Sequence, residues 1–144
     1  MSEPAPVLRL VDIRDTALDV AEVMAAVGDA SAGGVTLFVG AVRDHDSNRD
    51  VVGLEYSAHP TALAQLGEVA GRVAKEYDVL ALAAVHRVGK LAIGDAAVIV
   101  ATAAAHRGEA FEASRALIDE LKATVPIWKH QIFADGSDEW VGTP

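Results

Sequence analysis

The sequence contains no cysteine, and that absence removes several kinds of chemistry together. Disulfide bonds, thiolate nucleophiles and cysteine-ligated zinc sites are all excluded. The chain also has no thiol that could hold a transferable sulfur atom as a persulfide. Any sulfur chemistry that it performs must therefore take its sulfur from a donor outside the chain.

Basic residues are scarce as well. The sequence has 12 Lys and Arg against 21 Asp and Glu, which gives a formal net charge of -9. Nucleic acids and acidic membranes are disfavoured as partners, because binding to their phosphates requires a surplus of positive charge. The first six residues, MSEPAP, lack the features of a secretion signal, and no apolar run is long enough to span a membrane. We expect a cytoplasmic protein.

The sequence lacks the glycine-rich phosphate loops of the P-loop and dinucleotide-binding types, which excludes ATP binding by those routes. It also lacks internal repeats, low-complexity tracts and interdomain linkers. What it does have is 144 residues, 51% of them hydrophobic, which suffice for one domain with a buried core. Within this domain we expect residues 1–6 to be flexible and residues 135–144 to form a C-terminal hairpin and tail.

Apolar and alternating patterns predict an α+β domain in which strands outnumber three helices. Strands are expected over residues 7–13, 35–43, 51–58, 79–88, 91–93, 96–105, 127–133 and 138–141. Helices are expected over residues 17–27 with Asp15 as N-cap, from Pro60 at the first turn to about residue 77, and from an N-cap at Gly108 to the residues before Val125. In the last helix, one inward-facing stripe is predicted for Ala110, Phe111, Ser114, Leu117, Ile118 and Leu121.

Positive charge gathers between His106 and Lys129, in a chain whose overall charge has the opposite sign. His106 and Arg107 lie where a strand gives way to a helix, and the N–H groups and positive dipole end of a helix attract anions there. Lys122 and Lys129 flank a rigid corner formed by a proline, and Arg43 ends an earlier strand. We expect these five basic groups to meet in one anion-binding site.

Each of these features also has a simpler interpretation. A lysine in the last turn of a helix is commonly just a favourable charge near the negative dipole end. The pair His106-Arg107 is compatible with an ordinary polar strand exit, and the charged segment 43–50 is typical of a solvated hairpin loop. His86 is more typical of a satisfied core or strand-edge histidine than of a ligand. The argument for function therefore depends on the basic groups coming together in space.

Five segments, taken in order and spacing, carry a resemblance to a known family: VGAVRDHD, LEYSAHP, HRVGKLAIGD, AAAHRGEAF and LKATVPIWK. From about residue 7 to residue 140 the chain resembles the large, catalytic subunit of molybdopterin synthase. The resemblance implies an α/β-hammerhead fold with mixed and antiparallel strands. It also implies a homodimer at the centre of a heterotetramer with two copies of a small ubiquitin-like subunit.

The same resemblance implies the reaction. The small subunit's C-terminal Gly-Gly tail ends in a thiocarboxylate, and its sulfur is transferred to cyclic pyranopterin monophosphate to give the dithiolene of molybdopterin. No resident cofactor is implied, since the pterin is the substrate and molybdopterin the product. The absence of cysteine is then understandable, because the sulfur arrives on the partner.

Residue roles follow by motif. Lys122 and Lys129 would be the catalytic lysines, whereas Arg43, His106 and Arg107 would hold the anionic pterin, and no metal is implied. Neighbouring positive charges and partial burial both lower the pKa of an ammonium group. We therefore interpret Lys122 as the base or nucleophile and Lys129 as the group that stabilises developing negative charge.

The sequence departs from the family pattern at two places. Gln131 stands where members often have an acidic residue, and the tail around Trp140 is acidic where some members carry a further basic residue. Two other functions are also compatible with the residues. One is a non-catalytic module that binds an anion or a partner's C-terminal tail. The other is a metal-dependent hydrolase using Asp44, His45 and Asp46, the least favoured interpretation because adjacent residues rarely converge on one ion.

Overall fold

The computed structural model describes residues 6–142, so the predictions made for residues 1–5 and 143–144 lie outside the described residues. Three helices and nine strands follow one another along this part of the chain. In chain order they are β1 (Leu8–Arg14), α1 (Val20–Ala26), β2 (Gly34–Ala41), β3 (His45–Asp46), β4 (Arg49–Ala58), α2 (Ala62–Glu76), β5 (Ala81–Arg87), β6 (Gly89–Leu91), β7 (Ala96–Ala104), α3 (Arg107–Thr124), β8 (Ile127–Phe133) and β9 (Asp138–Val141). The α+β class predicted from the sequence is confirmed.

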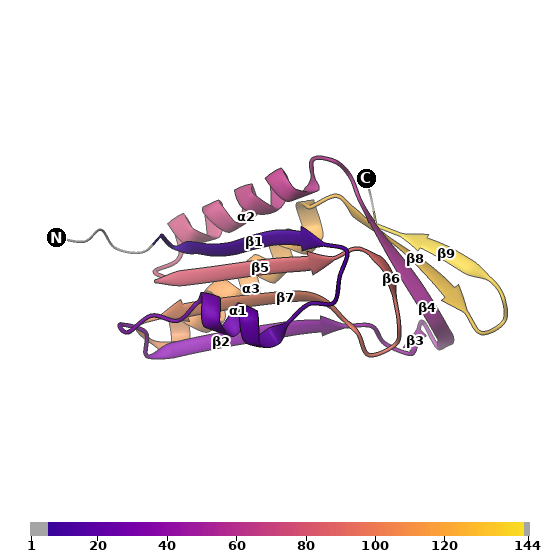
Figure 1. Cartoon of the computed structure of the whole chain (residues 1–144), viewed down its shortest axis with the longest axis horizontal. Helices are drawn as coiled ribbons and strands as arrows, with labels where there is room; N and C mark the ends of the chain where they lie inside the picture. The colour runs from indigo at the N-terminus through magenta and orange to yellow at the C-terminus, as the bar shows by residue number, and fades with distance from the viewer. Residues whose placement is uncertain (1–5, 143–144) are drawn as a thin grey trace.

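The first sheet has the strand order β1-β5-β7-β2, in which β1 and β5 are parallel and the other neighbours are antiparallel. Helices α2 and α3 cover one face of it and α1 lies on the other (Figure 1). Side chains point alternately to the two faces of the sheet. Because helices cover both faces, the side chains of the central strands β5 and β7 are buried on either side. Leu82, Ala84, Val98 and Val100 pack with α2 and α3, whereas Ala83, Val85, Ile99 and Ala101 pack with α1.

The second sheet is built around β4, which pairs with β3, β6 and β8, and β8 pairs in turn with β9. Its long strands run obliquely to those of the first sheet, beside the end of the first sheet where α3 finishes (Figure 1). A small cluster of Val42, Leu54, Leu91 and Ala97 packs where the two sheets meet. The position of this sheet decides where the functional side chains lie.

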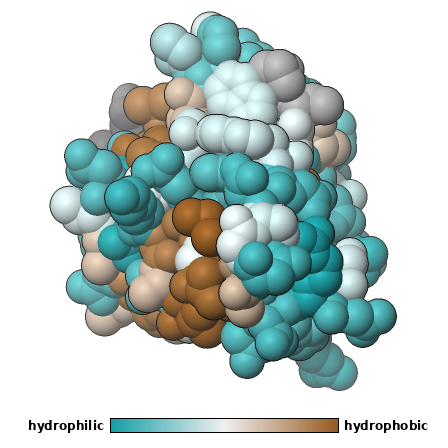
Figure 2. All heavy atoms as spheres, turned by 90° about the vertical axis from the view of Figure 1, so that its right-hand side faces the viewer, coloured by the Kyte–Doolittle hydropathy of each residue, from teal (hydrophilic) through white to brown (hydrophobic). Residues whose placement is uncertain are grey.

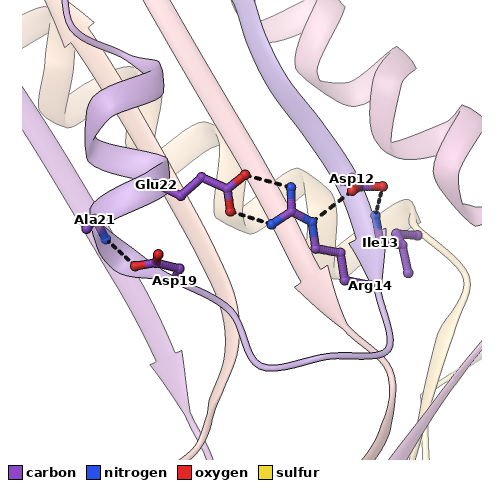
Figure 3. Close-up of polar contacts among 6 residues, drawn as sticks. All are labelled: Asp12, Ile13, Arg14, Asp19, Ala21 and Glu22. Carbon is purple, nitrogen blue, oxygen red and sulfur yellow. Dashed lines mark hydrogen bonds and ion pairs between the residues drawn. The ribbon is translucent and has the colours of Figure 1, made fainter.

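Helix α1 begins later than predicted. Asp19, and not Asp15, is its N-cap, because the Asp19 carboxylate accepts the Ala21 N–H at 2.9 Å (Figure 3). The Arg14 guanidinium then ties this helix to β1. It donates to both carboxylate oxygens of Glu22, at 2.5 and 2.9 Å, and to Asp12 at 2.9 Å.

The starts of the other two helices also differ from prediction. The N-cap of α2 is Thr61, so Pro60 precedes the helix and does not occupy its first turn. A turn closed by the bond from the Ala62 N–H to the His59 carbonyl accounts for the delay. In α3 the N-cap is His106 in an extended conformation, and Gly108 already lies inside the helix.

The predicted inward stripe of α3 is correct except at Phe111. The Phe111 side chain is 62% exposed, and Ala113 is buried in its stead. Phe111 directly follows the buried Ala110, and consecutive helix residues point about 100° apart, so it falls outside the stripe. On the exposed face of the helix, Arg115 and Asp119 form an ion pair one turn apart at 2.7 Å.

Candidate active site

The chain turns sharply at the end of α3, and this turn brings two lysines to one place. Lys122 lies in the last turn of the helix, which ends at Val125, whose N–H donates to the Leu121 carbonyl at 3.0 Å. Pro126 cannot continue the helix, and β8 starts at the following residue. Lys129 is in that strand, and both lysines line the same two hollows.

The register of the second sheet sets the neighbours of Lys129. Tyr56 in β4 and Val141 in β9 are its direct cross-strand partners. In the adjacent row Gln131 pairs with Leu54. Residues two apart on a strand share a face, so Lys129 and Gln131 point to the same side of the sheet.

Two adjoining hollows share Tyr56, Lys122 and Lys129 as a common wall. The polar hollow has a volume of about 200 Å³, and its other lining residues are Ala41, Val42, Arg43, His45, Leu54 and Gln131. The C-terminal hollow has a volume of about 190 Å³, and its other lining residues are His86, Leu121, Val125, Ile127, Val141 and Gly142. One hollow thus adds basic and amide groups to the lysines, and the other adds mainly apolar groups.

The amine of Lys122 is placed where it can lose its proton more easily than usual. Surrounding protein atoms lower the pKa of Lys122 below 10.5 by desolvation, and the positive charge of Lys129 lowers it further. The side chain as a whole remains open to solvent, since both hollows open onto it. A less basic amine beside a second lysine is suited to proton transfer or nucleophilic attack.

His86 and Tyr56 form an aromatic pair beneath Lys122. Their rings meet edge to face with centroids 5.0 Å apart. Burial, and secondarily the charge of Lys122, lowers the pKa of His86 to about 4, so its ring is neutral at physiological pH. The His86 Nδ1 lies 2.7 Å from the Arg87 carbonyl oxygen, which only accepts, so Nδ1 carries the proton. Burial raises the pKa of Tyr56, which keeps the phenol protonated.

The structure contradicts the prediction that all five basic groups meet within one chain. His106 and Arg107 begin α3, and Lys122 lies in its last turn, which at 1.5 Å per residue separates Arg107 from Lys122 by about 22 Å. At that end the backbone of β2 packs directly against the helix start. A Cβ atom on Gly34 would lie 2.9 Å from the Arg107 Cα.

Arg43 does reach the site, as predicted. It lines the polar hollow together with His45. The charged segment after Arg43 is a hairpin, with β3 paired to the start of β4. Its acidic residues bind protein groups: Asp44 lies 2.9 Å from His45 Nδ1, and Asp46 accepts a hydrogen bond from Gln131 at 2.8 Å. In the described part of the chain, no group of three or more His, Asp and Glu side chains is arranged to hold a metal ion.

Sequence reasoning missed Tyr56, His86 and Gln131 as site residues. His86 was predicted to be a core or edge histidine, and it is indeed buried, with 5% of its surface exposed. Its position two residues beyond Ala84 in β5 was the available signal, because that spacing directs it to the face covered by α3. The same spacing relates Gln131 to Lys129. Tyr56 required knowledge of the β4–β8 register, which the sequence does not give.

Comparisons with known proteins identify the family of this chain. The family model described as MoaE protein matches residues 13–124. The chain belongs to the MoaE family. A relative from Mycobacterium tuberculosis strain H37Rv, named molybdopterin synthase catalytic subunit 1, is 44% identical over 131 residues, which are 90% of this chain and 88% of the relative.

Solved structures of the family share the fold. Molybdopterin synthase from Staphylococcus aureus superposes with a TM-score of 0.84 at 30% identity, covering 90% of this chain and 95% of that chain. A protein–protein complex of subunits 1 and 2 of the molybdopterin-converting factor from Helicobacter pylori matches with a TM-score of 0.69 at 25% identity, covering 95% and 90%. In the described part of this chain, none of the three helices has the length and apolar character needed to cross a membrane.

Proposed function

We propose that this chain is the catalytic subunit of a molybdopterin synthase. It transfers sulfur from the C-terminal thiocarboxylate of a small ubiquitin-like partner to cyclic pyranopterin monophosphate, and so forms the dithiolene of molybdopterin. The observation that carries this proposal is the wall shared by the two hollows, where Lys122, with its lowered pKa, lies beside Lys129. The pterin is a substrate, and the proposal requires no resident cofactor. We place the reaction in the cytoplasm.

The two hollows suit the two reactants. The polar hollow, with Arg43 and both lysines, suits the anionic pterin, because cations favour a phosphate and the negative charge that develops during transfer. The C-terminal hollow is lined largely by apolar side chains, which suits an extended peptide tail. A tail held there would present its thiocarboxylate at the lysine wall, next to the pterin. Holding the two anions together removes much of the entropic barrier to their reaction.

In the transfer step, the thiocarboxylate sulfur forms a bond to a carbon of the pterin while a C–O bond at that carbon breaks, and the oxygen leaves as water or with the phosphate. The bond between the sulfur and the carbonyl carbon of the tail then breaks, so each sulfur that is added replaces one oxygen of the pterin. The acyl group passes to water, or first to the neutral amine of Lys122 and then to water. The tail leaves as an ordinary carboxylate. Lys129 stabilises the oxyanion that forms at the carbonyl.

A protein partner also needs a docking surface. Figure 2 looks at the end of the molecule formed by the second sheet and shows an apolar area surrounded by hydrophilic surface. Val52 and Ile132 in this sheet and Ile93 beside it are exposed apolar side chains. Apolar areas rimmed by polar residues are typical of protein interfaces. We propose that the small subunit binds at this end, in a heterotetramer centred on a homodimer of this chain.

The homodimer also offers a role to His106 and Arg107. Because they lie far from the lysine wall of their own chain, they bind the pterin only if they reach the pocket of a second copy. We keep them as substrate-binding residues in that form. Each pocket of the dimer would then combine Arg43, Lys122 and Lys129 of one copy with the start of α3 from the other.

The decisive experiment mixes the purified chain with thiocarboxylated small subunit and cyclic pyranopterin monophosphate, and follows molybdopterin by mass spectrometry. The proposal expects molybdopterin to form, with two small subunits consumed per pterin. The control uses a small subunit that ends in an ordinary carboxylate, which should bind and yield no product. Tight binding of both tails without any product from the thiocarboxylate would favour the non-catalytic module instead.

A further inference from the structure

Asp46 contacts two residues that line the polar hollow, Gln131 and Arg43. We propose that Asp46 is a positioning residue: its carboxylate fixes the orientation of Gln131 and directs Arg43 at the wall of the polar hollow, which sets the affinity for the pterin. This inference rests on the proposed function, because it concerns the same substrate. The buried side-chain amide of Gln131 supports this role by its geometry.

Gln131 is buried, with only 3% of its surface exposed, and it lines the polar hollow. Its Nε2 donates to Asp46 Oδ2 at 2.8 Å. A buried side-chain amide requires hydrogen-bond partners, and which way it is turned decides whether it presents a donor or an acceptor to a ligand. Asp46 makes that choice, because an ionised carboxylate only accepts. The Nε2 must therefore face Asp46, and Oε1 points the other way.

The surrounding charges keep Asp46 ionised. The pKa of Asp46 is lowered first by the hydrogen bond from Gln131, and then by the positive charges of Lys129, Arg43 and His45. Its other oxygen lies 3.5 Å from Arg43 Nη2. Arg43 is largely exposed, so this ion pair adds little to stability. It does restrict the directions in which the guanidinium points.

Asp46 also supplies a counter-charge that the hollow itself lacks. Among the described residues, the side chains that line the polar hollow include four basic ones and no acidic one. The carboxylate of Asp46 is held by Gln131, whereas the basic groups that line the hollow face its open space. A neutral residue at position 46 would let the Gln131 amide turn over and would release Arg43, so pterin affinity would fall.

The test moves the negative charge across the hydrogen bond. Three variants of the full complex are compared with wild type: Asp46→Asn, Gln131→Glu, and both changes together. Asp46→Asn keeps the shape and removes the charge. Gln131→Glu sets two carboxylates against each other, which cannot both stay ionised at this distance. The double variant restores one carboxylate and one amide, with the donor and acceptor exchanged. Asp50→Asn removes an equal charge from the exposed side of the same hairpin and serves as control.

For Asp46→Asn we expect the KM for the pterin to rise about tenfold, the usual scale for loss of one charge-assisted hydrogen bond, with kcat within about threefold of wild type. The Gln131→Glu variant should be at least as impaired, and the double variant should recover to within about threefold of wild type. Asp50→Asn should leave KM and kcat unchanged. A merely structural role would lower the active fraction, and thus kcat, without raising KM.

The inference is overturned if Asp46→Asn leaves KM within about twofold of wild type, if it lowers kcat alone, or if the double variant is no better than Gln131→Glu. Should the double variant not fold, the KM of Asp46→Asn decides by itself. A wild-type complex that makes no molybdopterin refutes the proposed function. An active wild type with an unaffected Asp46→Asn refutes only the role of Asp46.

Discussion

Helix α3 carries basic residues at both ends, yet the two ends have different surroundings. At its start, His106 and Arg107 are exposed, and the glycine-containing start of β2 packs against their backbone. At its finish, Lys122 faces a strand that folds back from Pro126 and carries Lys129. Among residues 6–142, the second end gathers basic groups from several parts of the chain around two hollows.

The difference shows that charge density along a sequence does not make a site. A site also requires a second helix or strand that packs beside the first and brings further functional side chains to it. The proline corner and β8 provide it at the end of α3, and β4 adds Tyr56 through the strand register. The start of α3 would become part of a site only if a second molecule supplied the missing wall.

The largest expected effect of any single change lies at Lys122. Replacing Lys122 with Ala should lower molybdopterin formation by about 10³-fold or more, because it removes the amine that accepts the proton or the acyl group. Lys122→Arg should be almost as inactive, since a guanidinium keeps the charge but does not deprotonate. Single-turnover product formation measures both.

The matched control is Lys75, which also lies in the last turn of a helix, α2, and is exposed. Lys75→Ala should leave turnover within about twofold of wild type, because that lysine interacts mainly with its helix dipole. Binding of the small subunit should survive in every variant. Substantial activity of Lys122→Arg would show that Lys122 acts only through its charge, and would remove the base or nucleophile role.

Much of the C-terminal end of α3 was predictable from the sequence. The spacing of apolar residues predicted the helix, and Pro126 predicted where it ends. The proximity of Lys122 and Lys129 followed from their positions on either side of the turn at Pro126. These are local features, in which a few adjacent residues determine the geometry. Strand Ala96–Ala104 and the terminal hairpin were predictable for the same reason.

The remainder depended on contacts between distant segments. The prediction that His106 and Arg107 lie beside Lys122 was wrong because the two groups are at opposite ends of α3. The length of this helix keeps them apart. The hydrogen bond between Asp46 and Gln131 joins residues 85 positions apart, and no pattern of apolar or polar residues in the sequence predicts it. The predicted start of α1 was wrong because Asp15 and Asp19 are equally good N-caps by composition, and the local sequence does not distinguish between them.

A second expected effect concerns His86, which lies beneath the lysine end of α3. Its folded-state pKa of about 4 is below the ordinary histidine value of 6.5, so the unfolded chain binds a proton at this residue more readily. The stability conferred by neutral His86 is therefore fully present above about pH 6.5 and is lost as the pH falls toward 4, by at most about 3 kcal/mol. Denaturant unfolding of wild type and His86→Gln at several pH values measures it.

The variant should lose less stability than wild type between pH 6.5 and pH 4, although it starts from a lower value. His59→Gln serves as the control, since His59 is exposed, and it should retain the wild-type pH dependence. If His86→Gln and wild type lost stability in parallel over this range, His86 would not be the buried neutral group described above.

The smallest expected effect tests the other end of the helix and bears most directly on the comparison. Arg107→Ala should raise the KM for the pterin about tenfold, through loss of a charge-assisted contact, whereas Arg115→Ala on the exposed face of α3 should not. Mixed dimers of an Arg107→Ala copy and a Lys122→Ala copy would contain one pocket in which Lys122 and the other copy's Arg107 are both intact. They should recover about half of the wild-type turnover at low pterin concentration, because one of two pockets is complete. If Arg107 served its own chain, every pocket would lack one group, and the mixed dimers would remain at or below the activity of Arg107→Ala alone.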